Sequence, residues 1–321
     1  MTNQSGPPAT GQEAYDRYRS RMFSIAYRML GSVGEAEDVV QEAYLRLHRA
    51  TMEGAAIESP EAFLTTVTTR LAIDTLRTAR VRRETYVGIW LPEPLLASTE
   101  PDPAEHAEQA DSLSLALLSL LETLSPVERA VFLLREIFDY DYDEIASIVQ
   151  KSDDNCRQIF VRARKRIDSG KSRFTADQQA QQELARRFFA AVDTGSLAGL
   201  VDFLAADVAF YGDGGGKANA VLRPIFGRDR VNRLLHSIFT KAHQADITYR
   251  LALVNGQPGA LSFDSNGGLV NVLALDIADG AIQTVRCIIN PDKLVHLGFP
   301  VSDLARLDKG DDDAALKGEQ Q

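Results

Sequence analysis

Residues 124–167 read LSPVERAVFLLREIFDYDYDEIASIVQKSDDNCRQIFVRARKRI. Apolar residues recur in this stretch at helical spacing with two interruptions, which predicts three helices. Asp143 can cap the middle helix, and Ser152 with the pair Asp153 and Asp154 can open the last one. Only a few residues separate these two helices, so the pattern is that of a helix-turn-helix.

The last of the three helices has a polar start and a basic second half. Residues 151–173 hold eight Lys or Arg against three Asp, a local charge of +5 in a chain of net charge −10. This contrast indicates contact with a phosphate backbone, the alternative being a charged face that is merely solvated. The polar start suits base edges in a major groove, and the basic half suits phosphates. The candidate DNA-binding residues here are Asn155, Arg157, Gln158, Arg162, Arg164 and Lys165.

A second helical region with a basic patch is predicted over residues 13–85. The turn sequence GSVGEAED separates two helices, and Ser59 and Pro60 provide the cap and first position of a third helix. From residue 70 to residue 83, five arginines stand against one aspartate, a local charge of +4. The arginines of this patch, also candidates for DNA binding, are Arg70, Arg77, Arg80, Arg82 and Arg83.

A proline-rich linker is predicted over residues 86–107, between the two helical regions. It contains four prolines and the only tryptophan of the chain, and it shows no regular period. An idle spacer is one interpretation. The apolar residues around the tryptophan instead favour a segment that docks onto a domain surface. Helices resume at residue 108 and continue to about residue 174.

The pattern changes again after residue 177. Two amphipathic helices, a strand beginning at Val208 and a third helix are followed by four strands that Asn-Gly, Asn-Gly-Gly and Asp-Gly turns separate. Helices followed by an antiparallel meander predict an α+β domain over residues 177–300. We expect residues 1–12 to be a disordered leader and residues 301–321 a frayed acidic tail.

The composition fits a multidomain intracellular protein. The 321 residues are 45% apolar, enough for packed cores, and the pI of about 5.1 argues against a protein that coats nucleic acid indiscriminately. Two cysteines far apart in sequence suit a reducing compartment, and neither a signal peptide nor a membrane span is predicted. We therefore expect a cytoplasmic protein, and the sequence predicts no catalytic residue, metal site or cofactor.

Two basic helical modules joined by a linker resemble an extracytoplasmic-function sigma factor over residues 13–173. GEAEDVVQEAYLRLHR resembles the helix that docks on RNA polymerase, and LAIDTLRTARVRRE resembles the helix that reads the promoter element nearer the start site. The helix-turn-helix resembles the reader of the farther element, although the family has glycine where Gln150 stands. By resemblance, residues 51–58 lie near an unstacked base. The implied polymerase-binding residues are Glu37, Asp38, Gln41, Glu42 and Arg46.

Residues 177–300 resemble a SnoaL-like domain, the cone-shaped fold of polyketide cyclases. Together with this domain, three short strings resemble the signature of the sigma factors numbered group 41: WLPEP, DGGGK and NPDKL. The three strings imply contacts between domains that regulate the protein within one chain. Their residues are Trp90, Leu91, Pro92, Glu93 and Pro94; Asp213, Gly214, Gly215, Gly216 and Lys217; and Asn290, Pro291, Asp292, Lys293 and Leu294.

The predicted architecture is therefore two all-α sigma modules followed by an α+β cone, with RNA polymerase core enzyme and promoter DNA as partners. Three alternatives remain at this point. The cone could sense a small molecule, or act as an enzyme through Asp213, His236, His243 or Asp276. The helix-turn-helix could instead belong to a regulator that needs no polymerase. A separate choice concerns the glycine run of DGGGK, which could hold an anion or permit a close approach of its backbone to a partner.

Overall fold

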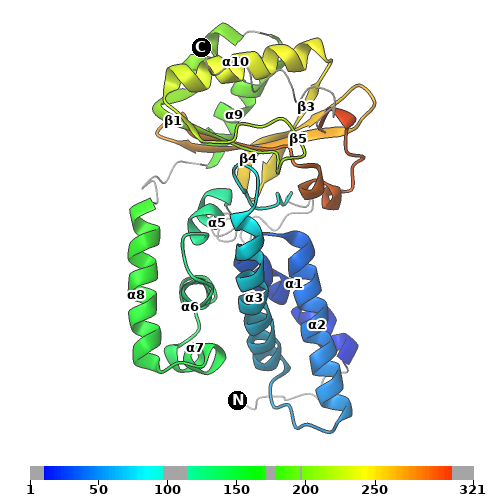
Figure 1. Ribbon diagram of the computed structural model, residues 1–321, viewed down its shortest axis with the longest axis vertical. Coiled ribbons are helices and arrows are strands. Elements are labelled where there is room, and N and C mark those ends of the chain that lie inside the picture. The colour runs from blue at the N-terminus through cyan, green and yellow to red at the C-terminus, as the bar shows by residue number, and fades with distance from the viewer. Residues whose placement is uncertain (1–10, 97–113, 171–177, 196, 306–321) are drawn as a thin grey trace. The chain divides into compact units, whose positions relative to one another are not determined.

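The computed structural model describes residues 11–96, 114–170, 178–195 and 197–305 (Figure 1). The chain forms two compact units: Met1–Thr85 with Ala116–Ser172, and Tyr86–Leu115 with Arg173–Gln321. The expectations for most of the leader, the end of the linker and the acidic tail lie outside the described residues. None of the described helices combines the length and apolar character that a membrane span requires.

The first unit begins with three long helices: α1 (Gly11–Leu30), α2 (Val33–Met52) and α3 (Pro60–Glu84). The predicted cap of α3 is confirmed, since the Ser59 hydroxyl accepts a hydrogen bond from the Ala62 backbone N–H at 3.2 Å. Apolar side chains facing one another exclude water from the centre of this group. They include Met22, Ile25, Leu30, Val40, Leu47, Leu64 and Leu76.

Four further helices complete the first unit: α5 (Leu115–Leu121), α6 (Pro126–Glu136), α7 (Tyr142–Val149) and α8 (Asp153–Gly170). The predicted helix-turn-helix is α7 followed by α8. The cap of α7 was predicted wrongly. Asp141 occupies that position in a capping box with Glu144, and Asp143 lies in the first turn, where its charge still suits the helix dipole.

The second unit contains a six-stranded sheet in the order β2-β1-β6-β5-β4-β3 (Figure 1). The predicted meander is confirmed, and β1 adds a parallel pairing with β6. The strands are β1 (Leu204–Asp213), β2 (Ile225–Phe226), β3 (Thr248–Val254), β4 (Gln257–Phe263), β5 (Leu269–Ala278) and β6 (Ala281–Ile288). The helical segments are α9 (Gln178–Asp193), the 3₁₀ helix η1 (Leu197–Phe203) and α10 (Arg228–Gln244).

The second predicted helix of this unit is shorter than expected. Only a 3₁₀ helix forms, and the chain enters β1 at Leu204, four residues before the strand predicted from Val208. Leu204 pairs with Ile282 of β6, and the register then shifts before Ala209, so this pairing with β6 extends the strand back to Leu204.

One face of the sheet is covered by α9 and α10, whose side chains pack against it (Figure 1). The Phe188 ring contacts Phe189 and Phe239 edge to face, with ring centres 5.2 and 5.9 Å apart. Tyr249 of β3 lies against the same group at 5.9 Å from Phe239. This arrangement is an aromatic core.

Candidate functional site

The motifs DGGGK and NPDKL lie side by side because β1 and β6 are parallel neighbours. Asp213 ends β1 opposite Ile288, which ends β6. The backbone N–H groups of Ile289 and Asn290 both donate to the Asp213 carbonyl oxygen at 2.9 Å. Since the carboxyl ends of parallel strands meet at the same edge of a sheet, two motifs about 80 residues apart in sequence form one surface.

The linker is fastened to this edge by a cluster that we call the clasp: Tyr86, Trp90, Leu91, Asp213, Asn290 and Lys293. The Asp213 carboxylate is 0% exposed and accepts hydrogen bonds from the Tyr86 hydroxyl and from the Leu91 N–H, the latter at 2.8 Å. Lys293 Nζ lies 2.7 Å from this carboxylate and donates to the Leu91 carbonyl oxygen. Each buried charge therefore has both an opposite charge and hydrogen-bond partners.

Aromatic rings complete the clasp. Lys293 Nζ lies 4.2 Å from the centre of the Trp90 ring and 5.1 Å from that of Tyr86, within the range of cation–π attraction. Burial, followed by the Asp213 charge, raises the pKa of the Tyr86 hydroxyl above its usual value. This hydroxyl therefore stays protonated and can donate to Asp213 while accepting a hydrogen bond from Asn290 Nδ2 at 2.8 Å.

The glycine run of DGGGK passes close to the clasp. A Cβ at Gly214 would overlap the Ala218 carbonyl oxygen, and one at Gly215 would overlap the Asn290 amide and approach the Tyr86 hydroxyl. Gly215 also has a φ of 58°, in the left-handed region. The described contacts of the glycine run are therefore those of a backbone that passes close to Asn290 and Tyr86. Lys217, at the end of the motif, forms an exposed ion pair with Asp292.

The remainder of the described linker follows the end of β3. The N–H of Leu95 donates to Asn255 Oδ1 at 2.8 Å, and the Asn255 N–H donates to the Leu95 carbonyl oxygen at 2.7 Å. His296 Nε2 lies 2.7 Å from the Pro94 carbonyl oxygen, and Leu96 bridges to Val254. The expectation that the linker docks onto a domain surface is therefore confirmed for residues 86–96.

In the first unit, three of the five α3 arginines donate to backbone carbonyl oxygens. Arg70 donates to the carbonyl oxygens of Ser147 and Ile148 at 2.9 Å, and Arg80 donates to that of Glu122 at 3.1 Å and to Leu124. The Arg83 guanidinium binds the Glu122 carboxylate and the Leu30 carbonyl oxygen. These bonds join α3 to the segment that precedes α6 and to α7. The other two arginines are exposed and form ion pairs, Arg77 with the exposed Asp74 and Arg82 with the half-buried Glu35.

Arg129 stands at the centre of this contact and is 1% exposed. Its guanidinium donates to the carbonyl oxygens of Leu121 and Met29 at 2.9 and 2.7 Å and to the Glu122 carboxylate at 2.6 Å. Burial opposes ionisation of Glu122, but the charges of Arg129 and Arg83 outweigh it and lower the pKa of this carboxyl. One buried network therefore holds the two helical groups of the first unit together.

The candidate residues of α8 occupy its exposed face. The polar start is built by Ser152, whose hydroxyl accepts from the Asn155 N–H at 3.4 Å, and Arg157 lies over the Tyr142 ring at 4.3 Å. Arg164 interacts with Glu136 and Asp168 at 3.7 Å. All six predicted side chains are exposed: Asn155, Arg157, Gln158, Arg162, Arg164 and Lys165.

The turn into α8 adopts the left-handed conformation despite lacking glycine. Gln150 ends α7 with φ 55° and ψ 54°, and its N–H donates to the Ala146 carbonyl oxygen. A side chain in this region costs roughly 1 kcal/mol. The turn therefore keeps the geometry that glycine would permit, at an energetic cost.

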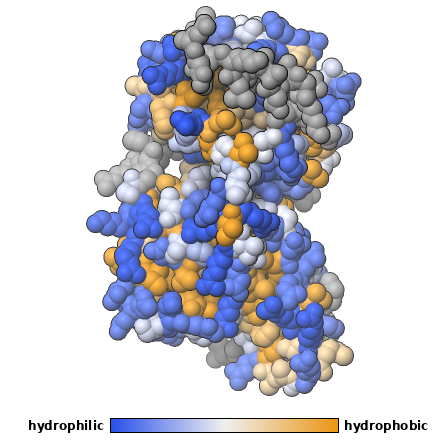
Figure 2. Space-filling view, viewed as in Figure 1, coloured by the Kyte–Doolittle hydropathy of each residue, from blue (hydrophilic) through white to orange (hydrophobic). Residues whose placement is uncertain are grey.

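The five candidate polymerase-binding residues line the polar side of α2. Three of them take part in ion pairs, Glu37 with Arg19 at 2.7 Å and Glu42 with Arg46 at 2.8 Å, while Asp38 is exposed. The fifth, Gln41, is exposed as well. Figure 2 shows pale and orange surface where α2 ends and the chain turns towards α3. Met52 at this turn is 76% exposed.

The four candidate catalytic residues do not converge on one cavity. Asp213 belongs to the clasp, whereas Asp276 forms an ion pair with Arg286 and accepts from Gln257. His236 and His243 are exposed on α10. Within the described part of the chain, no group of His, Cys, Asp and Glu is placed to hold a metal ion.

Comparison with known proteins matches both helical groups to one family. The Sigma-70 region 2 model matches residues 14–82, and the Sigma-70 region 4 model matches residues 114–167. The ECF RNA polymerase sigma factor SigJ of Mycobacterium tuberculosis is 35% identical over 90% of this chain and 94% of its own. The probable ECF RNA polymerase sigma factor SigI of that organism is 34% identical over 88% and 93%.

The likeness extends to the three-dimensional fold. The crystal structure of Mycobacterium tuberculosis SigJ matches with a TM-score of 0.70 and 33% identity, and the match covers 88% of this chain and 97% of that one. This coverage includes the α+β unit as well as the helical one, which confirms the predicted fold class. The chain belongs to the extracytoplasmic-function (ECF) family of RNA polymerase sigma factors.

Proposed function

We propose that this protein binds core RNA polymerase through α2 and directs initiation at promoters that α3 and α8 recognise. The observation that carries the proposal is α8 itself, the second helix of a helix-turn-helix, with an exposed polar start and an exposed basic second half. This order places base-reading groups before phosphate-binding groups along one helix. The proposal locates the protein in the cytoplasm, where the polymerase works.

Within α8, Gln158 and Arg162 have different roles in the proposal. Gln158 belongs to the polar start of α8, where its amide can pair with an adenine edge. Arg162 lies one turn later and suits a phosphate. The Gln158→Ala variant should change promoter preference by roughly 1–3 kcal/mol between the best and altered sequences. The Arg162→Ala variant should weaken binding about equally on every sequence. Arg186→Ala, an exposed arginine of α9 paired with Glu183, is the matched control.

The decisive experiment is a gel shift and run-off transcription with and without core enzyme, using a library of promoter sequences. A sigma factor gives promoter-specific complexes and transcripts that depend on the core enzyme. Tight sequence-specific duplex binding by the isolated protein, unaffected by polymerase, would instead support a self-sufficient helix-turn-helix regulator. Failure to associate with core enzyme would contradict the proposal outright.

In this proposal, the first unit as described is closed to DNA at α3, because several arginines of α3 are bound to protein groups. Arg70, Arg80 and Arg83 were predicted to contact DNA, yet each already donates to protein oxygens. A guanidinium whose donors are occupied has fewer left for phosphate. We infer that at least part of this contact must open before α3 binds its promoter element.

The second unit, in our proposal, regulates the sigma modules within the chain. The support is the clasp, which fixes the linker between the two sigma modules to the two motif loops. A fixed linker limits how far apart the two readers can move. We expect Trp90→Ala and deletion of residues 290–321 to change promoter-dependent transcription. If both variants remain folded by circular dichroism and transcribe as the unmodified protein does, this regulatory role is wrong.

We also infer that the second unit carries out no catalysis. The four candidate acids and bases are dispersed over the clasp, an ion pair and an exposed helix, and the sheet face under α9 and α10 is filled by aliphatic and aromatic side chains. General acid–base chemistry requires a side chain positioned within hydrogen-bond reach of a substrate. Incubation with candidate metabolites should give no turnover. Turnover by the unmodified protein would contradict the inference. If that turnover survived in the Asp276→Asn and His236→Ala variants, the active site would lie elsewhere.

A further inference from the structure

The second unit carries a basic surface that the motifs of its sequence do not explain. Residues 223–233 contain four arginines and one aspartate, a local charge of +3 in a chain of net −10. Between residues 178 and 305 there are eleven Lys or Arg, so more than a third of them fall within eleven positions. This concentration lies at the start of α10 and just before it.

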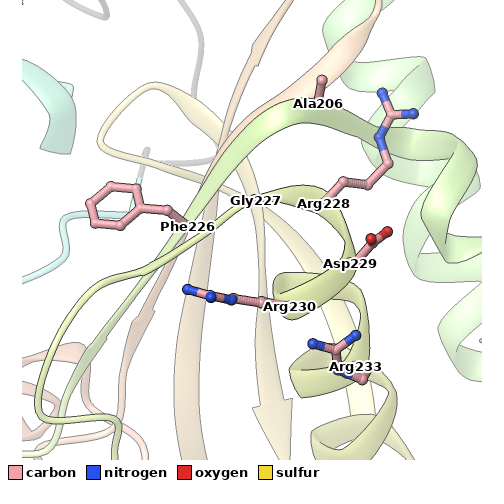
Figure 3. Close-up of a pocket in the computed structure, with 7 residues that line it drawn as sticks. All are labelled: Ala206, Phe226, Gly227, Arg228, Asp229, Arg230 and Arg233. Atoms are coloured by element: carbon pink, nitrogen blue, oxygen red, sulfur yellow. The ribbon is translucent and has the colours of Figure 1, made fainter.

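Three of these arginines surround a hollow of about 450 Å³. Arg228, Arg230 and Arg233 line it together with Phe226, and Asp229 is the only acidic residue among the lining side chains. In Figure 3, Arg230 and Arg233 extend to the side on which the Phe226 ring lies, whereas Arg228 extends away towards Ala206. The guanidinium groups are therefore spread over a surface and do not converge on one point.

The arginines of the hollow lack the carboxylate partners that two other arginines of the unit have. Arg186 pairs with Glu183 and Arg286 pairs with Asp276. Within the described part of the chain, Arg228, Arg230 and Arg233 are exposed and form no ion pair with a carboxylate. Their donors are free for an external anion, and the planar guanidinium suits phosphate oxygens in particular.

We propose that this arginine surface binds the phosphate backbone of promoter DNA, as a third DNA contact beside α3 and α8. The spread of the side chains favours a chain of phosphates over a single small anion, because Arg228 extends away from the side to which Arg230 and Arg233 extend. Phosphate contacts of this kind position a protein on DNA without reading its sequence. The inference rests on the proposed function for the identity of the nucleic acid.

The test measures how strongly promoter binding depends on salt. Each phosphate that a side chain neutralises contributes about 0.9 to the slope of log affinity against log salt concentration. We expect Arg230→Ala with Arg233→Ala, in full-length protein bound to core enzyme, to reduce that slope by about 1 to 2. Arg186→Ala with Lys241→Ala removes the same charge from exposed positions of the same unit and serves as the control. Arg230→Lys with Arg233→Lys should retain the slope.

The outcomes separate this inference from the proposed function. If the unmodified holoenzyme does not bind promoter DNA, the proposed function fails. If it binds and the two double alanine variants have equal slopes, only the arginine surface is refuted. If millimolar ATP raises the melting temperature of the unmodified protein but not of the Arg230→Ala, Arg233→Ala variant while the slopes agree, the surface binds free nucleotides and the assignment to DNA is overturned.

Discussion

Lys293 Nζ lies 2.7 Å from Asp213 Oδ2, and both side chains are buried where the linker meets the ends of β1 and β6. A second lysine and aspartate of the same two motifs, Lys217 and Asp292, form an ion pair that is exposed. The two pairs differ in solvation more than in chemistry, which makes them a matched comparison.

We predict that Lys293→Met destabilises the second unit by about 3 kcal/mol, because removal of one partner leaves the Asp213 carboxylate buried without its counter-charge. Lys217→Met should change stability by less than about 1 kcal/mol, since an exposed ion pair contributes little. Urea denaturation followed by tryptophan fluorescence measures both, and Trp90 in the clasp is the only tryptophan. Equal effects of the two substitutions would show that the clasp does not stabilise the unit.

The turn residue Asn255 should hold the linker against the end of β3, whereas the similar turn residue Asp279 should not contact the linker. Asn255 and Asp279 both precede a glycine and have φ near 50°, but only Asn255 bonds to Leu95. We predict that Asn255→Gly keeps the hairpin and loses an acceptor for the Leu95 N–H, which costs roughly 1 kcal/mol. Hydrogen exchange at Leu95 should then accelerate, whereas Asp279→Gly leaves it unchanged. Protection of Leu95 in the Asn255 variant would contradict this role.

Gln150 provides a test of backbone strain. Because its φ of 55° lies in the region that favours glycine, Gln150→Gly should stabilise the first unit by about 0.5–1 kcal/mol. Ser147→Gly, in the exposed interior of α7, should destabilise by a similar amount, since glycine there only adds freedom to the unfolded chain. Thermal denaturation distinguishes the two, and a loss of stability in the Gln150 variant would show that its side chain has a compensating contact.

Local features of the fold could be predicted from the sequence because a few adjacent residues determine them. Ser59 caps α3 as predicted, and the Asn-Gly and Asp-Gly turns join the strands they were expected to join. The cap of α7 was misplaced by two residues because Asp141 and Asp143 have the same capping chemistry. Only the capping box with Glu144 distinguishes them.

Contacts between distant segments were less predictable. The three motifs identified the clasp region, but not Tyr86, Asn255 or His296, because nothing local shows that β1 lies parallel to β6 or that the linker reaches β3. A tyrosine at the start of an apolar linker was the only signal for Tyr86. Likewise, a count of charges in α3 cannot tell that Arg70 and Arg83 donate to carbonyl oxygens and a carboxylate within the protein.

The final prediction concerns Glu122, whose carboxylate binds the buried Arg129 and the Arg83 guanidinium. Burial opposes its ionisation, but the two arginines lower its pKa in the folded protein below the value in the unfolded chain, which is about 4.3. A carboxyl shifted in this direction stabilises the fold fully above the unfolded pKa, and this contribution is lost as the pH falls through the folded pKa.

Near neutral pH, Glu122→Gln should therefore destabilise the first unit by about 3 kcal/mol, since Arg129 keeps a buried charge without its partner. As the pH falls from about 5 through the folded pKa, the stability of the unmodified protein should fall towards that of the variant. Glu183→Gln, at an exposed pair on α9, is the control and should show a much smaller change. Denaturation curves across this pH range provide the measurement, and a difference between the unmodified protein and Glu122→Gln that does not vary with pH would refute the proposed ionic link between the two helical groups.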